Sequence, residues 1–473
     1  MYAAVVILAY FVVMFAISTY SMRKQNNVAE FFVAKNQLGV LLIVPLMFAE
    51  MIAGAGTVGN AATAFNLGLS SVWANWGMCI GCVFMVVFAA TFYRVAGVKM
   101  GAMSVPEAYQ MRFDFRTRTA MLIILTIVYL ILFAIQPVAA ASILSPLLNI
   151  DFTLMSWIVG IGFIYLALAG RKGIAWMNFV HAVVMYFGLL IVCIFAIKEA
   201  GGLAHMRSVL PSTMFSVVQP DFMTVLAWGL GTGISFLAAS TVVAVVYGGR
   251  DIKSINTGML LSGLLVFVFA VFPSLIGIAG KVVLPDAYSR DILYLMADHL
   301  GPTFTILASM GVLAAILSTG PSVLLIVATI ISRDFYRIIK PHATGQQELN
   351  FSKACTIILG LIAIFGGLHA GSILDQVLGA FQIRSIAGLV LVIAVFWPRV
   401  SNDAAFWSMI LGGITAALWH FLGSPLGIAP LWPSLALSLP VLVVLTLMSK
   451  EKISSGARIY LEAKKELMAK GTF

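Results

Sequence analysis

Two charged residues lie inside apolar stretches of the chain, where a charge is energetically costly. Glu50 stands in the run FAEMIAG and Arg384 in the run AFQIRSIAG. A charged side chain at the centre of a membrane helix costs roughly 2.5–3.5 kcal/mol on insertion scales, so we expect each residue to have a partner or a function. A guanidinium binds a carboxylate through two parallel hydrogen bonds, which makes Arg384 a candidate to dock an acidic substrate. Two alternatives remain open, because Arg384 could pair with Glu50 or Asp375, and Glu50 could carry a coupling proton.

Two glycine clusters interrupt the apolar stretches. The first lies in IAGAGTVGN and the second in WGLGTGISF, and their members are Gly54, Gly56 and Gly59, and Gly229, Gly231 and Gly233. Each glycine weakens a helix by roughly 1 kcal/mol relative to alanine. The clusters therefore predict local unwinding, which would expose backbone carbonyls to an ion or a substrate. Close helix packing through small residues is the alternative for either cluster taken alone.

Single polar residues in and near these clusters are candidates for substrate contact. Together with two of the glycines, the candidates are Gly54, Gly56, Thr57, Asn60, Gln136, Thr232, Ser235 and Gln382. A single polar residue in a membrane helix also commonly forms a hydrogen bond to a neighbouring helix, which is the alternative for each of them.

The elements that must position these residues are membrane helices. The chain has 473 residues, of which 61% are hydrophobic and 10% charged, whereas soluble proteins are about 25% charged. Apolar runs of about 20 residues recur along the chain, the length that a helix needs to cross the bilayer, so we expect an all-α integral membrane protein rather than a barrel. We predict thirteen spans, near residues 2–20, 38–66, 71–92, 119–147, 152–170, 174–197, 222–247, 256–280, 303–332, 354–370, 375–397, 404–422 and 431–448.

The charge distribution predicts an orientation for these spans. The formal net charge is +10, with 28 lysines and arginines. When alternate loops are assigned to alternate sides, most of the basic residues fall on one side, which the positive-inside rule places in the cytoplasm. The N-terminus is then expected outside and the C-terminus inside, as an odd number of spans requires.

The two glycine clusters occupy matching positions in two sets of five spans. Spans 2–6 and 7–11 each begin with a cluster, and because five is odd the two sets must cross the membrane in opposite directions. Inverted repeats with broken helices at the midplane are the sequence sign of secondary transporters.

Other classes of membrane protein fit less well. An enzyme would need clustered catalytic side chains, but the six histidines are far apart and most acidic residues lie in loops. An ion channel would carry a filter motif or rings of charge. A sensor would carry a signalling domain after the last span, where we expect only a short basic helix at the lipid surface.

Several stretches, in order along the chain, resemble the sodium:solute symporter family. The second span resembles the family's first core helix, and four further stretches resemble the segment after the second core helix, a segment of the fifth, the eighth core helix and the end of the tenth. These stretches are GAGTVGNAATAFNLG, MSVPEAYQMRF, GRKGIAWMNFVHA, LAAILSTGPSVLLIVATIISRDFYR and VFWPR. The resemblance implies the LeuT-like five-plus-five fold and alternating access driven by sodium.

The resemblance also implies a sodium site built from uncharged oxygens. The second span would provide the backbone carbonyls of Ala49 and Ile52. The ninth span would provide the Ala315 carbonyl and the hydroxyls of Ser318 and Thr319, although adjacent Ser and Thr can also bond to their own helix. Pro321 departs from the family pattern and could strain this helix, because it removes a backbone donor.

Some members of the family hold a second sodium ion. Ser322 stands at the position of the serine that this site uses, but Asn178 stands where the family has an aspartate. The loss of that charge argues for one sodium ion per cycle, although the amide oxygen could still act as a weak ligand.

Together these observations predict the organisation of the chain. We expect an extra helix and loop over 1–37, a first repeat over 38–197, an extracellular loop over 198–221, a second repeat over 222–397, two added helices over 398–448 and a basic cytoplasmic tail over 449–473. We predict a sodium-coupled importer of a small carboxylate or amino acid, not an enzyme, that acts as a monomer in the cell membrane. Its expected partners are its substrate and membrane lipid, with no nucleic acid. A proton-coupled carrier using Glu50 and a sodium symporter of a neutral sugar or polyol are the alternatives.

Overall fold

The computed structural model describes residues 2–23, 38–168, 170–336, 339–369, 373–450 and 452–469. Within these ranges the chain forms helices and no strand, as predicted, and one isolated β-bridge joins Leu38 to Gly249. The helices of the first half are α1 (Tyr2–Arg23), α3 (Val40–Met51), the π-helical turn η1 (Ala55–Gly59), α4 (Asn60–Leu67), α5 (Trp73–Phe84), α6 (Ala90–Lys99), α7 (Val105–Arg112), α8 (Phe115–Leu148), α9 (Phe152–Ala167) and α10 (Gly170–Glu199). The helices of the second half are α11 (Gly202–Val209), α12 (Phe222–Phe236), α13 (Ser240–Gly248), α14 (Ile252–Phe269), α15 (Val271–Val283), α16 (Ile292–Leu300), α17 (Pro302–Ile331), α19 (Gly345–Gly367), α20 (Ile373–Phe396), α21 (Asn402–Phe421), α22 (Leu431–Met448) and α23 (Ser455–Ala469).

Among the described residues, nine helices are long and apolar enough to cross a membrane, or ten if the bent pair α12 and α13 counts as one span. Three further apolar helices are shorter: Leu8–Tyr20, α3 and α9. Residues 55–99 count as one helical stretch by this criterion although the sequence predicts two spans there. The count of thirteen therefore stays a prediction.

The first predicted break is present. Helix α3 ends at Met51, Ile52 is extended (φ −93°, ψ 92°), and the chain resumes as a π-helical turn at Ala55. The unwound residues lie directly before and at the start of the glycine cluster, as the sequence predicts.

The second glycine cluster does not mark a break, which corrects the sequence-based expectation. Helix α12 runs without interruption through Gly229, Gly231 and Gly233, and the chain bends by 40° only after it, between Phe236 and Ser240. The glycines serve close packing instead: a Cβ atom on Gly229 would lie 2.9 Å from the ring of Trp73, and one on Gly233 would lie 2.9 Å from Ile80.

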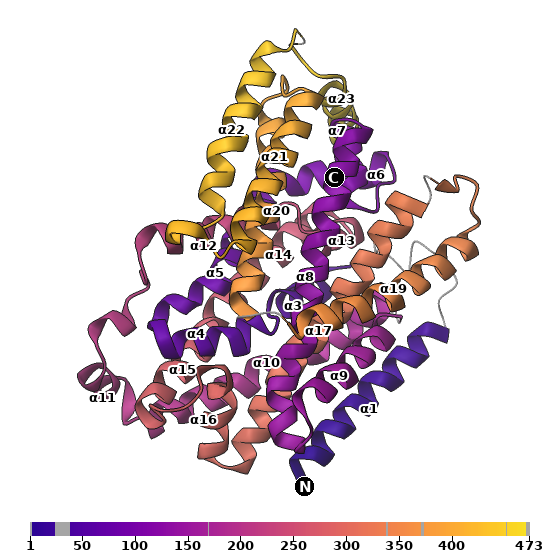
Figure 1. Cartoon of the computed structure of the whole chain (residues 1–473). Coiled ribbons are helices and arrows are strands. Elements are labelled where there is room, and N and C mark those ends of the chain that lie inside the picture. The colour runs from indigo at the N-terminus through magenta and orange to yellow at the C-terminus, as the bar shows by residue number, and fades with distance from the viewer. Residues whose placement is uncertain are drawn as a thin grey trace.

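The helices next to the two breaks, α3 and α12, pack against several other helices of the bundle. Helix α12 packs against α5 and α20, α3 packs against α14 and α17, and α17 also packs against α8 and α10. Helix α17 runs through Pro321 without interruption, and its residues from Gly311 to Ile330 are all buried. The N-terminal end of α1 lies at one end of the molecule, and the C-terminal helix α23 lies towards the other (Figure 1).

The C-terminal helix α23 is docked on the protein. It packs on α6 and α7 (Figure 1), and an ion pair joins Lys99 to Glu466. The Tyr460 ring lies 5.4 Å from the Phe92 ring, and the buried Arg112 donates a hydrogen bond of 2.7 Å to Ser454, just before α23. One face of the basic tail is therefore held by protein contacts.

Candidate functional site

A cavity lies where α3 and the pair α12 and α13 meet α8, α17 and α20. We call it the central cavity. Most of its wall is apolar, with methionines 47, 51 and 78 and the rings of Tyr129, Phe236 and Phe381. Its polar lining residues are Glu50, Asn75, Gln136, Thr232, Thr241, Thr319, Ser322 and Arg384. The two intramembrane charges that the sequence singles out therefore line one cavity.

Four of the five predicted sodium ligands meet at the edge of this cavity. The Ser318 hydroxyl lies 2.6 Å from the Ala49 carbonyl oxygen and 2.7 Å from the Ala315 carbonyl oxygen. The Thr319 hydroxyl lies 3.2 Å from the Ala315 oxygen and 3.5 Å from the Ala49 oxygen, and 3.4 Å from Ser318 Oγ. The two hydroxyls and two carbonyls thus form one cluster of uncharged oxygens, which is the ligand type that hard cations bind.

The break in α3 explains why carbonyl oxygens are available here. The last carbonyls of a helix have no partner further along it, and they carry the negative end of the helix dipole. Ala49 lies in the last turn of α3, and Ile52, the fifth predicted ligand, is the first residue after it. Half-helix ends of this kind coordinate sodium in transporters with broken helices, and the donor set fits that ion.

Ser322 and Glu50 meet one turn along α17. Ser322 donates hydrogen bonds of 3.1 Å to Glu50 Oε1 and of 3.1 Å to the Ser318 carbonyl. Glu50 is adjacent to Ala49, so its carboxylate lies on the side of the oxygen cluster that faces Ser322.

Asn178 is fully buried in α10, and within the described part of the chain neither of its side-chain polar atoms has a hydrogen-bond partner. Helices α10 and α17 pack side by side, with Gly188 against Leu307 and Gly311 against Leu189. Because residue numbers rise along α10 as they fall along α17, this register places Asn178 level with residues 317–322, the part of α17 that carries Ser318 and Ser322.

Arg384 is 3% exposed and lines the central cavity. Its Nε donates to the Ser235 carbonyl at 3.1 Å and to the Ser235 hydroxyl at 2.8 Å. Its guanidinium carbon lies 5.5 Å from the centre of the Tyr129 ring and 5.2 Å from that of Phe381. Among the described residues, Arg384 forms no ion pair with Glu50 or Asp375, and Tyr129 is its nearest polar neighbour besides Ser235.

The other predicted substrate contacts divide into two groups. Gly56, Gln136 and Thr232 line the central cavity, and the hydroxyl of Thr232 is buried without a partner in the described structure. Gln136 also accepts a hydrogen bond of 3.3 Å from the Gly54 amide, so it holds the unwound segment.

The second group makes contacts between or within helices. Asn60 donates to the Ala270 carbonyl at 3.2 Å and accepts from Ser274, while Thr57 donates to the Ala53 carbonyl at 3.2 Å in the unwound segment before its helix. Gln382 accepts from the Leu431 amide at 3.1 Å and lines a different cavity, with Trp228, Asp375 and His420. Together with Ser235, which holds Arg384, these residues lie outside the wall of the central cavity.

Among the residues of the cavity wall that sequence reasoning missed are Asn75, Tyr129 and Thr241. Asn75 of α5 donates to the Gly56 carbonyl at 3.1 Å, and its oxygen has no partner among the described residues. Tyr129 of α8 packs beside Arg384. The only signal for Asn75 is a single polar residue in the apolar stretch after the first glycine cluster, and Tyr129 carries none that separates it from other aromatic residues.

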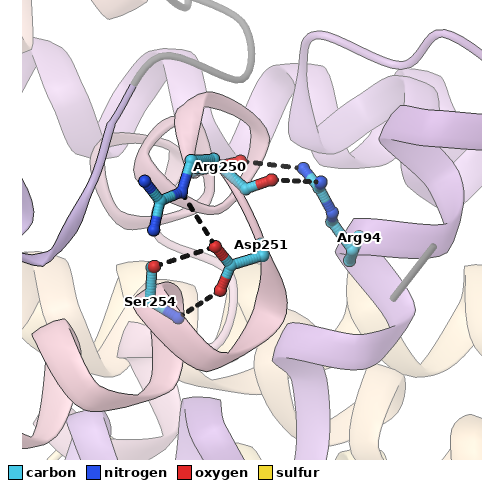
Figure 2. A network of polar contacts seen from close by, with 5 residues as sticks. Arg94, Arg250, Asp251 and Ser254 are labelled. Atoms are coloured by element: carbon cyan, nitrogen blue, oxygen red, sulfur yellow. Dashed lines mark hydrogen bonds and ion pairs between the residues drawn. The ribbon is translucent and has the colours of Figure 1, made fainter. Parts of the chain in front are cut away.

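A second polar network holds the far end of α13. Arg94 donates to the Gly249 carbonyl at 2.9 Å and to the Arg250 carbonyl at 3.0 Å (Figure 2). Asp251 caps α14 by accepting from the Ser254 amide at 2.7 Å and also accepts from Arg250 at 3.1 Å (Figure 2). These donors, the Ser254 amide foremost, lower the pKa of Asp251 below its usual value. Leu38, just before α3, also bonds to Gly248 and Arg250. The network therefore joins α3 and α6 to the C-terminal end of α13.

Comparison with solved structures places this arrangement in a known fold. The chain superposes with a TM-score of 0.81 on a Na⁺-coupled sialic acid symporter in a substrate-bound outward-open state, at 18% identity over 96% of this chain and 99% of the other. It also superposes on Mhp1, a nucleobase-cation-symport-1 family transporter, with a TM-score of 0.63 and 15% identity over 92% of this chain and 98% of the other. At these identities the likeness establishes the fold, which is the LeuT fold.

Sequence comparison supplies relatives across nearly the whole chain. The chain is 25% identical to the high-affinity proline transporter PutP of Bacillus subtilis, over 86% of this chain and 89% of the relative. It is 24% identical to the sodium/pantothenate symporter of Escherichia coli, over 93% of this chain and 95% of the relative. The sodium:solute symporter family model matches residues 31–412. The chain is therefore a multi-pass membrane transporter that belongs to the sodium:solute symporter family.

Proposed function

We propose that this symporter imports a small organic carboxylate or amino acid together with sodium, by alternating access. The observation that carries the proposal is the buried Arg384 guanidinium, which lines the central cavity and forms no ion pair with a carboxylate among the described residues. A buried guanidinium is costly unless it meets an anion, and a carboxylate matches its paired donors. A neutral sugar or polyol, the alternative substrate class, would leave that cation without a counter-charge.

The solutes after which the relatives are named support the same class. Proline, pantothenate and sialic acid all carry a carboxylate at neutral pH, and they are the solutes of three similar proteins. The apolar remainder of the cavity wall is typical of small-molecule sites, in which a few polar groups fix the orientation of the ligand.

Sodium is the coupling ion that the proposal assigns to the oxygen cluster of Ala49, Ile52, Ala315, Ser318 and Thr319. A cation entering this cluster would replace the hydrogen bonds that its hydroxyls now make to the carbonyls. Asn178 and Ser322 are proposed as a weaker second site, because Asn178 has no carboxylate to attract a second cation. Proton coupling through Glu50 is the alternative, and its contact with Ser322 places it beside the same cluster.

The proposal keeps the predicted topology, with the N-terminus outside, the C-terminus in the cytoplasm, two inverted repeats over 38–197 and 222–397, and a monomer as the working unit. The start of α1 and the helix α23 lie towards opposite ends of the molecule, which is consistent with an odd number of crossings (Figure 1). The outer face of the basic helix α23 is proposed to meet anionic lipid.

A thermal-shift screen of the purified protein tests this function. L-Proline, pantothenate, sialic acid and D-glucose are each added in sodium and in potassium buffers, at pH 6 and pH 8. Stabilisation by one of the three carboxylates in sodium alone, at both pH values, supports the proposal. Stabilisation by glucose and by no carboxylate would overturn the substrate class, and stabilisation that follows pH rather than sodium would favour coupling through Glu50.

A further inference from the structure

Tyr129 caps a helix that its own sequence leaves uncapped. The first residue before α13 is Ala239, whose side chain cannot accept a hydrogen bond from the free amides of the first turn. The Tyr129 hydroxyl, which comes from α8, accepts from the Ser240 amide at 2.5 Å and from the Thr241 amide at 3.4 Å. Tyr129 is 1% exposed, so water does not replace this contact.

The other side of the same break is held by two more residues. Arg384 donates to the Ser235 carbonyl, in the last turn of α12, and Tyr93 donates to the Leu237 carbonyl at 2.8 Å. The Arg384 guanidinium carbon also lies 5.5 Å from the Tyr129 ring centre. The end of α12 and the start of α13 are therefore attached to two neighbouring side chains, Arg384 and Tyr129.

Helix α13 is only nine residues long, and its far end is attached to elements that enter the bundle at other points. Leu38, just before α3, accepts from the Arg250 amide and donates to the Gly248 carbonyl, both at 2.9 Å. Arg94 of α6 holds the Gly249 and Arg250 carbonyls (Figure 2). A short helix fixed at both ends transmits a displacement from one end to the other, because packed interiors shift between discrete arrangements rather than deform continuously.

We propose that Tyr129 is a positioning residue that links the state of Arg384 in the central cavity to the position of α13, and through α13 to the Leu38 and Arg94 contacts. The inference rests on the proposed function in assigning the substrate carboxylate to Arg384. A carboxylate that binds the terminal nitrogens of Arg384 fixes the guanidinium over the Tyr129 ring, and the Tyr129 hydroxyl carries that constraint to the first turn of α13. Linkage makes this coupling reciprocal. If substrate binding stabilises the position of α13 by a given factor, then release of α13 at its far end weakens substrate binding by that factor.

The link is tested without any substrate by amide hydrogen exchange on the full-length protein in sodium buffer. The variants are Tyr129→Phe, Arg384→Ala and the double variant, and the readout is exchange at Ser240 and Thr241. Tyr129→Phe removes the acceptor and is expected to raise exchange about tenfold. Arg384→Ala removes no contact to α13, but it is expected to raise the exchange rate as well. Because the two residues act in series, exchange in the double variant should be only slightly faster than in Tyr129→Phe.

Tyr10→Phe is the matched control. Tyr10 is a buried tyrosine whose hydroxyl bonds to His181 Nδ1, between α1 and α10. It loses one buried hydrogen bond that does not involve the break, so exchange at Ser240 and Thr241 should stay at the level of the unaltered protein. The inference is overturned if Arg384→Ala leaves this exchange unchanged, or if the effects of the two substitutions multiply.

Uptake into proteoliposomes provides a second readout, which a merely structural role would not produce. L-Proline, pantothenate and sialic acid are each offered with a sodium gradient. For the solute that is transported, Tyr129→Phe should lower the maximal rate about tenfold while the half-saturating concentration changes less than about threefold. A rise in the half-saturating concentration with an unchanged rate would contradict the link. If the unaltered protein transports none of the three, the proposed substrate class fails, and the exchange experiment still decides the role of Tyr129.

Discussion

The Ser318 hydroxyl lies 2.6 Å from the Ala49 carbonyl oxygen, although 269 positions separate the two residues. The contact joins the middle of α17 to the last turn of α3, directly before the chain unwinds at Ile52. Two helices from different halves of the sequence therefore share one set of oxygens. An ion bound there would hold α3 against α17, and loss of the ion would free them to separate, which is how a coupling ion can bias a transporter between two conformations.

Removal of either hydroxyl should weaken sodium coupling. We expect Ser318→Ala and Thr319→Ala to raise the sodium concentration for half-maximal uptake about tenfold, because each variant loses one ion ligand worth roughly 1–2 kcal/mol. The measurement is solute uptake as a function of sodium concentration. Ser309→Ala is the matched control, since Ser309 is a buried serine in the same helix whose hydroxyl has no partner among the described residues. Unchanged sodium dependence in both site variants would remove this site.

Two substitutions of Arg384 should show how much of substrate binding depends on its positive charge and how much on its paired hydrogen-bond donors. Arg384→Ala is expected to lower uptake of a carboxylate substrate by a factor of about 100 or more, because a buried charged hydrogen-bonded pair is worth roughly 2–5 kcal/mol. Arg384→Lys keeps the charge but not the paired donors, and it should restore only part of the activity.

Uptake assays over L-proline, pantothenate and sialic acid measure both Arg384 variants. Protein that is correctly folded but transports at the normal rate in both variants would exclude docking by Arg384. A loss that is equal for a carboxylate and for a neutral solute would assign Arg384 a structural role through Ser235.

Much of the fold can be predicted from the sequence, because long apolar runs predict membrane helices. The break after α3 also follows, since the glycines there allow a π-helical turn and extended residues. The second break does not, because its residues, Leu237, Ala238 and Ala239, carry no helix-breaking signal. Its unpaired backbone groups are satisfied by Tyr93 and Tyr129 from other helices. A tertiary contact of this kind leaves no local pattern in the sequence.

The sequence predicted those residues of the candidate site whose type is unusual in an apolar stretch. Glu50 and Arg384 are charges in apolar runs, and both line the central cavity. Asn60 and Gln382 are also polar residues within apolar runs, but they do not line this cavity. They bond to Ser274 and to the Leu431 amide at contacts between helices. Which polar residue faces the cavity depends on the rotation of each helix about its own axis, and packing decides that rotation.

Close approach of α20 to α12 should make Gly388 intolerant of a side chain. A Cβ atom there would lie 2.1 Å from the Ile234 carbonyl oxygen, which belongs to the backbone and cannot move aside alone. We expect Gly388→Ala to destabilise the protein by about 1–3 kcal/mol, the usual cost of overpacking, and to lower uptake, because Arg384 lies one turn away on the same helix.

Gly366→Ala is the control for this prediction. Gly366 is also inside a helix, α19, but a Cβ atom there would have no neighbour within 4 Å. Alanine should then be neutral or slightly stabilising, by up to about 1 kcal/mol. Thermal unfolding of the two variants in detergent compares them, and equal unfolding temperatures would show that α20 can move away from α12 at little cost.

Acid should remove the helix cap at Asp251. Its pKa is lowered in the folded protein, chiefly by the Ser254 amide and then by Arg250, so the carboxylate stabilises the fold at pH values above its unfolded pKa near 3.9. That stabilisation is lost as the pH falls through the lower, folded pKa. Asp251→Ala should therefore cost about 1 kcal/mol at pH 7, and the difference from the unaltered protein should narrow towards pH 3. Asp251→Asn keeps an uncharged acceptor at every pH, so its stability should exceed that of Asp251→Ala by an amount that does not change with pH. Thermal unfolding from pH 7 to pH 3 measures all three proteins, and a constant gap between Asp251→Ala and the unaltered protein would show that the carboxylate does not hold this cap.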